Sequence, residues 1–235
     1  MNILAFDCCF GAVSAAVQYA DGRSQAVRYE QLSGGNAERL FPLIEEVLAE
    51  AKLPADKVDR IAVTLGPGTF TGVRVGVAAA RALSLGLRKP VVGITSLAAM
   101  AHRASQLLKP EHESWPMVVA VDARRGMIYL QRFDGASGSA GDPVLLTATD
   151  AARVLASPKM RDPLLAVGSG GEAVAEAMRA AGNDCRADLP DLQPHAGSVA
   201  ELATNLQPLE RVAPLYLRQP DVTVRETPSL VGGQA

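Results

Sequence analysis

The chain contains one pattern of strands and acidic residues twice, and this repeat limits its fold more than any other feature. In the first copy a strand ends at Asp7, a short turn leads to a second strand, and Asp21-Gly22 closes it. In the second copy a strand ends at Asp122, and Asp134-Gly135 closes the strand that follows. Each copy continues into a third strand and then into alternating helices and strands. This order predicts a duplicated mixed α/β fold with two lobes.

Apolar periodicity and turn residues place the elements. In the first half we expect strands over 3–7, 12–19, 24–29, 60–65 and 90–94, and helices over 36–52, 71–87 and 95–108. In the second half we expect strands over 117–122, 127–133, 144–147 and 164–167, and helices from 149 or 150, over 171–181 and over 196–205. Asn36 is the expected N-cap of the first helix, and Thr69 or Thr71 that of the second.

The lobes follow from these elements. The polar interval 109–115 separates the two halves, so we expect an N-terminal lobe over 1–108 and a C-terminal lobe over 115–218. Residues 219–235 form the expected flexible tail.

Composition and charge narrow the classes of function. The chain is 48% hydrophobic and 20% charged, which is ordinary for a soluble globular protein. Its net charge is −2 and it has no long basic run, so it lacks the electrostatic footprint of a nucleic-acid binder. If RNA is a substrate, we expect this chain to contact it only indirectly.

The cysteines and apolar stretches predict a cytoplasmic location without membrane contact. Cys8, Cys9 and Cys185 are an odd set, with two of them adjacent, and are read as thiols in a reducing compartment. Asp7 ends the first apolar stretch too early for a signal peptide. The longest apolar run is interrupted by arginines at 74, 81 and 88, so we expect no membrane span.

A mixed fold of this kind belongs, by analogy, to the sugar kinase, Hsp70 and actin (ASKHA) superfamily. There, paired strand-Asp-turn-strand hairpins hold phosphates and a magnesium ion between the lobes. Asp7 and Asp122 occupy the positions of such carboxylates. The alternative is that each Asp starts a turn after a strand, and the bulky segment Cys8-Cys9-Phe10 suits a phosphate poorly. Gly168 and Gly170, before a helix, are the better nucleotide candidates.

The most specific stretch is LGPGTFTGVRVG, residues 65–76, which lacks the lysine and spacing of a phosphate loop. Gly72, Gly76, Ala80 and Ser84 recur every four residues in the helix that follows, and four small residues on one ridge let another helix approach closely. The neighbouring helix carries an apolar stripe that Phe41 widens.

Two interpretations fit this pair of helices: both pack on their own sheet, or they form a dimerisation surface. The second predicts an interface made by Leu40, Phe41, Ile44, Val47, Leu48, Gly72, Val73, Gly76, Val77, Ala80 and Ser84.

Five segments in order resemble the TsaB family, and they span both lobes. They are ILAFD, LGPGTFTGVRVG, PVVGITSLAAMA, VDARRGMIY and PLYLR. The resemblance implies an actin-like fold and a complex with TsaD and the ATPase TsaE, which attaches a threonylcarbamoyl group to an adenosine of tRNA. It also implies that the first two helices serve self-association and pairing with TsaD. Asn36 and Met127 depart from the family pattern, which usually has His and Glu there.

The comparison with TsaD implies that this chain is not the catalyst. TsaD-like proteins carry a metal-binding His-x-x-x-His pair where this chain has Ser96 and Met100, and a hydroxyl and a thioether do not replace two imidazoles. The same change weighs against a metallopeptidase. A small-molecule kinase on this scaffold is the other alternative. We therefore expect a non-catalytic subunit without a metal or cofactor of its own, with ATP or ADP possible at the interface of the complex.

Overall fold

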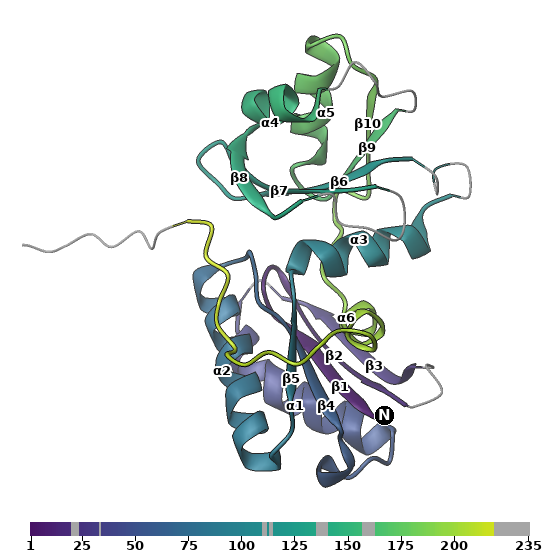
Figure 1. Ribbon diagram of the computed structural model, residues 1–235, viewed down its shortest axis with the longest axis vertical. Helices are drawn as coiled ribbons and strands as arrows, with labels where there is room; N and C mark the ends of the chain where they lie inside the picture. The colour runs from purple at the N-terminus through teal and green to yellow at the C-terminus, as the bar shows by residue number, and fades with distance from the viewer. Residues whose placement is uncertain are drawn as a thin grey trace, which may run out of the picture.

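The computed structural model contains two five-stranded sheets, one above the other in Figure 1. The first sheet has the strand order β3-β2-β1-β4-β5, and the second has the order β8-β7-β6-β9-β10. In both, the first three strands form an antiparallel meander and the last two run parallel to the first. The described residues are 1–19, 24–32, 34–109, 112, 115–134, 141–156 and 163–218.

Each half of the chain supplies the same sequence of elements. The first half comprises β1 (Ile3–Asp7), β2 (Ala12–Gln18), β3 (Ser24–Gln31), α1 (Asn36–Glu50), the short 3-10 helix η1 (Ala55–Lys57), β4 (Arg60–Thr64), α2 (Phe70–Leu87), β5 (Val91–Ile94) and α3 (Ser96–Leu107). The second comprises β6 (Met117–Asp122), β7 (Met127–Phe133), β8 (Val144–Thr147), α4 (Ala148–Leu155), β9 (Leu164–Val167), α5 (Gly171–Ala180), β10 (Cys185–Asp188) and α6 (Ala196–Ala203). The predicted duplicated α/β fold, with two mixed sheets and flanking helices, is confirmed.

Helices cover both faces of each sheet, which explains why the central strands are apolar on both sides. β1 is buried along its whole length. Helices α1 and α2 pack on one face of the first sheet and α6 on the other. In the second lobe α4 and α5 pack on one face, and α3 packs against β6 and β7 on the other.

The last helix of each half crosses to the other lobe. Helix α3 follows the first sheet but contributes Leu97 and Met100 to the core of the second. Helix α6 follows the second sheet but packs Val199 and Ala203 against β1 and β4 of the first. The predicted range 115–218 for the second lobe therefore includes a segment that packs on the first sheet, because the chain returns there after β10.

Several sequence expectations change at the level of single elements. Strand β10 was not predicted, and α1 ends at Glu50 rather than near 52. The N-cap of α1 is Gly35, in a left-handed conformation, instead of Asn36. Thr69 caps α2 as expected, and its hydroxyl accepts a hydrogen bond from Gly72 N. The turn at Asp21-Gly22, the residue Gly135 and the tail 219–235 lie outside the described residues.

Helix α2 also differs from the expectation about membranes. By length and mean hydropathy it is apolar enough to cross a bilayer, although arginines interrupt it. In this fold 33% of that stretch is buried, and its inner face packs on β4. A core helix of a soluble protein can be as long and as apolar, so length and hydropathy alone do not identify α2 as a membrane span.

Candidate functional site

The first acidic position, Asp7, lies inside the first lobe. Its side chain has no exposed surface, and its Oδ1 accepts hydrogen bonds from Thr64 Oγ1 at 2.5 Å and from Cys9 N at 3.2 Å. Burial raises the pKa of this carboxyl to about 6, and the hydrogen bond from Thr64 offsets part of that rise. A carboxylate enclosed in this way offers no oxygen to a ligand between the lobes in this conformation.

The turn after Asp7 is filled by its own side chains and by the start of α2. The Cys8 and Cys9 side chains are both buried, and burial raises the pKa of each thiol well above its usual range. Cys9 O accepts hydrogen bonds from Thr69 N at 2.8 Å and from Thr69 Oγ1 at 3.1 Å. Cys8 Sγ donates to Gly72 O. The polar groups of the turn and of the N-terminus of α2 therefore form hydrogen bonds with each other. This leaves the turn poorly suited to binding a phosphate.

The second acidic position is exposed and lies beside the predicted glycine turn. Asp122 N donates to Ser169 Oγ at 3.0 Å, and Gly170 N donates to Ala120 O at 3.0 Å. Asp122 Oδ1 accepts from Arg124 N at 2.7 Å, so the carboxylate closes the β6–β7 turn. Asp122, Gly168 and Gly170 are thus brought together, whereas Asp7 is buried in the other lobe. A nucleotide at this edge stays a prediction.

Ser96 and Met100, the positions that the resemblance implied for a lost metal site, both lie in the interior of this structure. Ser96 is buried and its Oγ donates a hydrogen bond to Pro67 O, while Met100 is 1% exposed in the core of the second lobe. Nearby, His102 of α3 lies with its Nε2 3.4 Å from Glu201 Oε2 of α6. Within the described residues, no cluster of three or more His, Cys, Asp or Glu side chains could hold an ion.

Most residues of the predicted interface are buried in the protein's own core, and the interface itself stays a prediction. On α1 and α2 the side chains that pack inward against the first sheet are Leu40, Ile44, Val47, Val73, Val77 and Ala80. The glycines serve close approach within the chain: a Cβ on Gly72 would lie 2.1 Å from Cys8 O, and one on Gly76 would lie 3.4 Å from Cys8 Sγ. The N-terminal part of the small-residue ridge, Gly72 and Gly76, therefore faces the β1–β2 turn.

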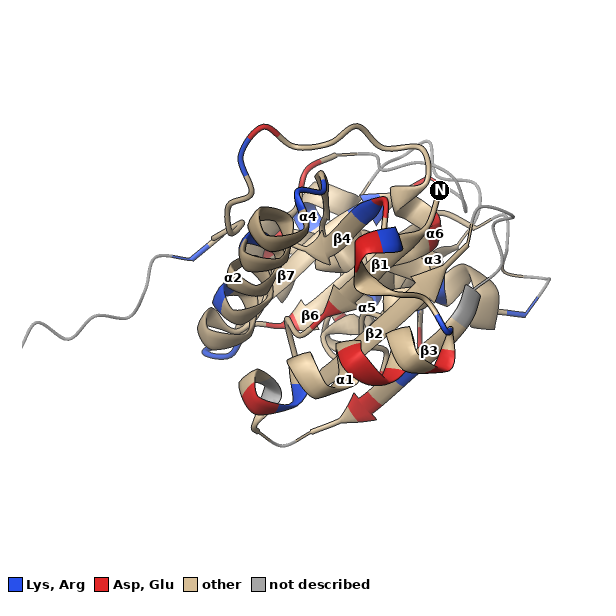
Figure 2. Ribbon diagram, turned by 90° about the horizontal axis from the view of Figure 1, so that it is seen from below, with Lys and Arg blue, Asp and Glu red and all other residues tan. Residues whose placement is uncertain are grey.

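The opposite sides of these helices expose large apolar side chains among charged ones, and we call these sides together the outer α1–α2 face. It comprises Phe41 on α1 and Phe70, Arg74 and Leu85 on α2, with exposed fractions of 44% for Phe41, 45% for Phe70 and 84% for Leu85. Of the predicted set, Phe41 is exposed and Leu48 and Ser84 are half-buried. Figure 2 shows acidic residues along α1 and basic residues along α2, which gives the face charges of both signs.

Residues 206–218, which we call the C-terminal strap, extend this face (Figure 1). Leu209 N donates to Val91 O at 2.8 Å, and Leu215 N donates to Leu65 O at 2.7 Å. The Tyr216 ring stacks on Phe70 with centroids 5.7 Å apart, and the Arg74 guanidinium lies 4.8 Å from the centre of the Phe70 ring. The aromatic pair and its cation form a continuous exposed cluster at the start of α2.

The end of the C-terminal strap joins the two lobes. Arg218 donates a hydrogen bond to Ala123 O at 3.0 Å, and Leu217 packs against the core of the second lobe. The sequence indicated PLYLR as a family segment but gave no sign of this bridging position.

Fold and site together define a two-lobed α/β protein in which the turn after Asp7 is filled by side chains and the first two helices expose large apolar side chains. The sequence model of the family described as "TsaD: tRNA N6-adenosine threonylcarbamoyltransferase" matches residues 30–189. The chain belongs to this family, and its similarity to TsaB proteins confirms the resemblance read from its motifs.

Individual relatives agree with this assignment. TsaB of Haemophilus influenzae is 36% identical over 132 residues, 56% of this chain, and TsaB of Escherichia coli is 32% identical over 129 residues, 55% of this chain. Both matches span 53% of the relative's length, about half of each of these proteins. An uncharacterized protein of Mycobacterium tuberculosis is 31% identical over 94% of this chain and 93% of its own length.

A solved structure extends the similarity to the whole fold. The crystal structure of YeaZ from Pseudomonas aeruginosa superposes with a TM-score of 0.78 at 28% identity, and covers 92% of this chain and 99% of its own.

Proposed function

We propose that this protein is a non-catalytic subunit needed for threonylcarbamoyladenosine modification of tRNA, and that it binds and activates TsaD. The family match and the TsaB relatives support the pathway. The filled turn at Cys8-Cys9 and the buried Asp7 support a subunit that binds a partner and does not itself catalyse a reaction.

The observation that carries the docking part of the proposal is the outer α1–α2 face. Large apolar side chains are normally buried, and Leu85 is 84% exposed on a helix that also exposes Phe70. Aromatic residues and arginine are enriched among residues that dominate binding energy, and the Tyr216–Phe70–Arg74 cluster has this composition. We infer that TsaD docks on this face. The buried sides of α1 and α2, which pack on the first sheet, keep the face rigid.

The same surface accounts for the remaining proposed partners. In the absence of TsaD, two copies of the chain pair through it, since acidic α1 of one copy complements basic α2 of the other. TsaE binds the assembled pair, and ATP or ADP binds at the interface of the complex rather than in this chain alone. The tRNA is held by the partners, since the net charge of this chain is −2. We propose that the protein acts in the cytoplasm.

A reconstituted transfer assay tests the function. Purified TsaD and TsaE are supplied with tRNA, ATP and threonylcarbamoyl donor, with and without this chain, and modified adenosine is quantified by mass spectrometry. We expect modification to depend on the chain, and the chain alone to produce none. Equal modification in its absence would refute the proposal, and phosphorylation of a small molecule by the isolated chain would favour a kinase instead.

A further inference from the structure

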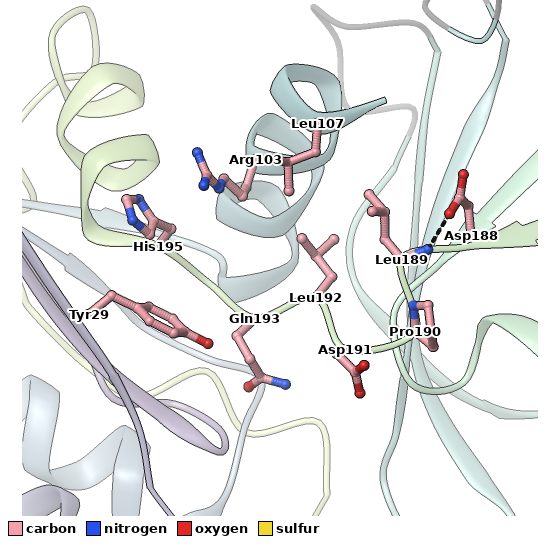
Figure 3. A pocket seen from close by; sticks show the side chains of 10 residues that line it. All are labelled: Tyr29, Arg103, Leu107, Asp188, Leu189, Pro190, Asp191, Leu192, Gln193 and His195. Carbon is pink, nitrogen blue, oxygen red and sulfur yellow. Dashed lines mark hydrogen bonds between the residues drawn. The ribbon is translucent and has the colours of Figure 1, made fainter. Parts of the chain in front are cut away.

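A cavity of about 480 Å³ lies between the lobes, beside β3 (Figure 3). Its walls come from β3, α3 and the connector 188–195 between β10 and α6. Strand β3 and strand β5 form opposite edges of the first sheet, so the cavity lies away from α2 and the C-terminal strap. Its size falls within the range of small-molecule sites, roughly 300–1,000 Å³, and its residues take no part in the proposed docking face.

Arg103 lines one side of the cavity, and a hydrogen bond orients its side chain. Arg103 on α3 donates from one guanidinium nitrogen to Gln106 Oε1 at 3.2 Å, and Gln106 Nε2 in turn donates to Glu201 Oε2 at 3.0 Å. A guanidinium has five donors, and in the described part of the chain this is its one hydrogen bond. The remaining donors are therefore available to an anion, and the glutamine orients the group.

The wall beside Arg103 is aromatic and uncharged. The rings of Tyr29 and His195 stack with centroids 5.9 Å apart and an interplanar angle of 28°. Burial, together with the nearby charge of Arg103, lowers the pKa of His195 to about 4, so the imidazole is neutral at pH 7. Of Tyr29, Arg103 and His195, only Arg103 is therefore charged at pH 7.

The connector supplies the complementary charge over an apolar floor. Asp188 and Asp191 line the cavity, and Figure 3 shows Asp191 on the other side of Leu192 from Arg103. Leu192 is 7% exposed and packs in the second lobe's core, whereas Leu107 is 48% exposed at the rim. A positive group, an apolar floor and a negative group therefore follow one another across the cavity.

We propose that this inter-lobe cavity binds a small zwitterionic ligand with an apolar body, of the amino acid or dipeptide class. The ligand carboxylate pairs with Arg103, its ammonium with Asp191, and its apolar side chain covers Leu107 and Leu192 beside the Tyr29 ring. Because the walls come from both lobes, the bound ligand also links them.

Isothermal titration calorimetry of the full chain tests this site with L-leucyl-L-leucine and L-leucine as probes. Two further probes each lack one charge: 4-methylpentanoate has no ammonium, and 3-methylbutylamine has no carboxylate. We expect at least one zwitterion to bind and both single-charge analogues to bind about 10-fold more weakly or worse, the usual effect of losing a charge-assisted hydrogen bond. Failure of both zwitterions to bind at millimolar concentration, or equal binding of the analogues, would overturn the proposal.

Variants locate the site. Arg103→Gln and the exposed Asp191→Asn should each weaken binding about 10-fold, whereas Arg153→Gln on α4, distant from the cavity, should leave it unchanged. Circular dichroism confirms that each variant is folded. Because Asp191 is exposed and makes no packing contact in the core, Asp191→Asn decides the matter if Arg103→Gln does not fold. Equal affinity of Asp191→Asn and the unsubstituted chain would contradict the assignment.

Discussion

Replacing Gly72 by alanine should destabilise the protein, because α2 approaches the β1–β2 turn at this residue. The added Cβ would lie 2.1 Å from Cys8 O and 2.7 Å from Thr69 Oγ1, and Cβ atoms in real structures essentially never come closer than 3.0 Å to such neighbours. Cys8 O is a backbone atom of a turn that is itself hydrogen-bonded to α2. The clash therefore forces either the helix or the turn to move.

The magnitude follows from two opposing effects. Overpacking a well-packed core costs about 1–3 kcal/mol, and the upper end applies because the obstructing atom is backbone. Alanine in place of glycine in a helix returns up to about 1 kcal/mol. The free energy of unfolding should therefore fall by about 2 kcal/mol, which for a chain of this length lowers Tm by roughly 4–8 °C.

The same helix provides matched controls. A Cβ on Gly86 would meet nothing within 4 Å, so Gly86→Ala should raise the free energy of unfolding by up to about 1 kcal/mol. A Cβ on Gly76 would lie 3.4 Å from Cys8 Sγ, and that variant should be close to neutral. Urea denaturation followed by circular dichroism measures all three variants. If Gly72→Ala is as stable as Gly86→Ala, the small-residue ridge does not pack on the turn and the reasoning fails.

Two further predictions concern the buried carboxyl and the C-terminal strap. Since the pKa of Asp7 rises from 3.8 to about 6 on folding, the folded chain binds the proton more tightly, and the free energy of unfolding should fall as pH rises through that interval by on the order of 3 kcal/mol. Asp7→Asn should abolish this loss in urea titrations at several pH values, and an unchanged pH dependence would contradict the buried carboxyl. Arg218→Ala should accelerate amide hydrogen exchange in the β6–β7 turn by removing the bond to Ala123 O, whereas the exposed Arg211→Ala should not. Identical exchange in both variants would show that the C-terminal strap does not hold the second lobe.

The duplicated fold could be predicted because the two halves repeat the same buried strands and turns. Strand β10 was not predicted, because Cys185-Arg186-Ala187-Asp188 alternates apolar and polar residues over only four positions, and its two apolar residues are small. The return of α6 to the first sheet was also hidden, because its apolar composition suits either sheet equally well.

Which side chains of α1 and α2 are exposed could not be predicted from the sequence. Periodicity identifies an apolar stripe such as Leu40, Ile44 and Val47, but it does not say whether that stripe covers the chain's own sheet or a partner. Here it covers the chain's own sheet, and the exposed residues are those on the opposite side of the helices, including Phe70 and Leu85. Phe70 was passed over because it precedes the expected start of its helix.

The inter-lobe cavity had no sequence signal. Tyr29, Arg103 and His195 lie far apart in the chain and meet because α3 and α6 exchange lobes. Neither residue spacing nor composition predicts that a helix crosses to the other lobe, so only the structure identifies this cavity.

The affinity of this chain for TsaD, measured by calorimetry for a matched pair of variants, tests the docking surface most directly. Phe70 and Val154 are both exposed hydrophobic residues on helices, but Phe70 lies on the outer α1–α2 face and Val154 on α4 of the second lobe. Loss of an interface hot spot costs about 2 kcal/mol or more, so Phe70→Asp should weaken binding about 30-fold or more while Val154→Asp leaves it unchanged. Equal affinities for the two folded variants would contradict docking through this face.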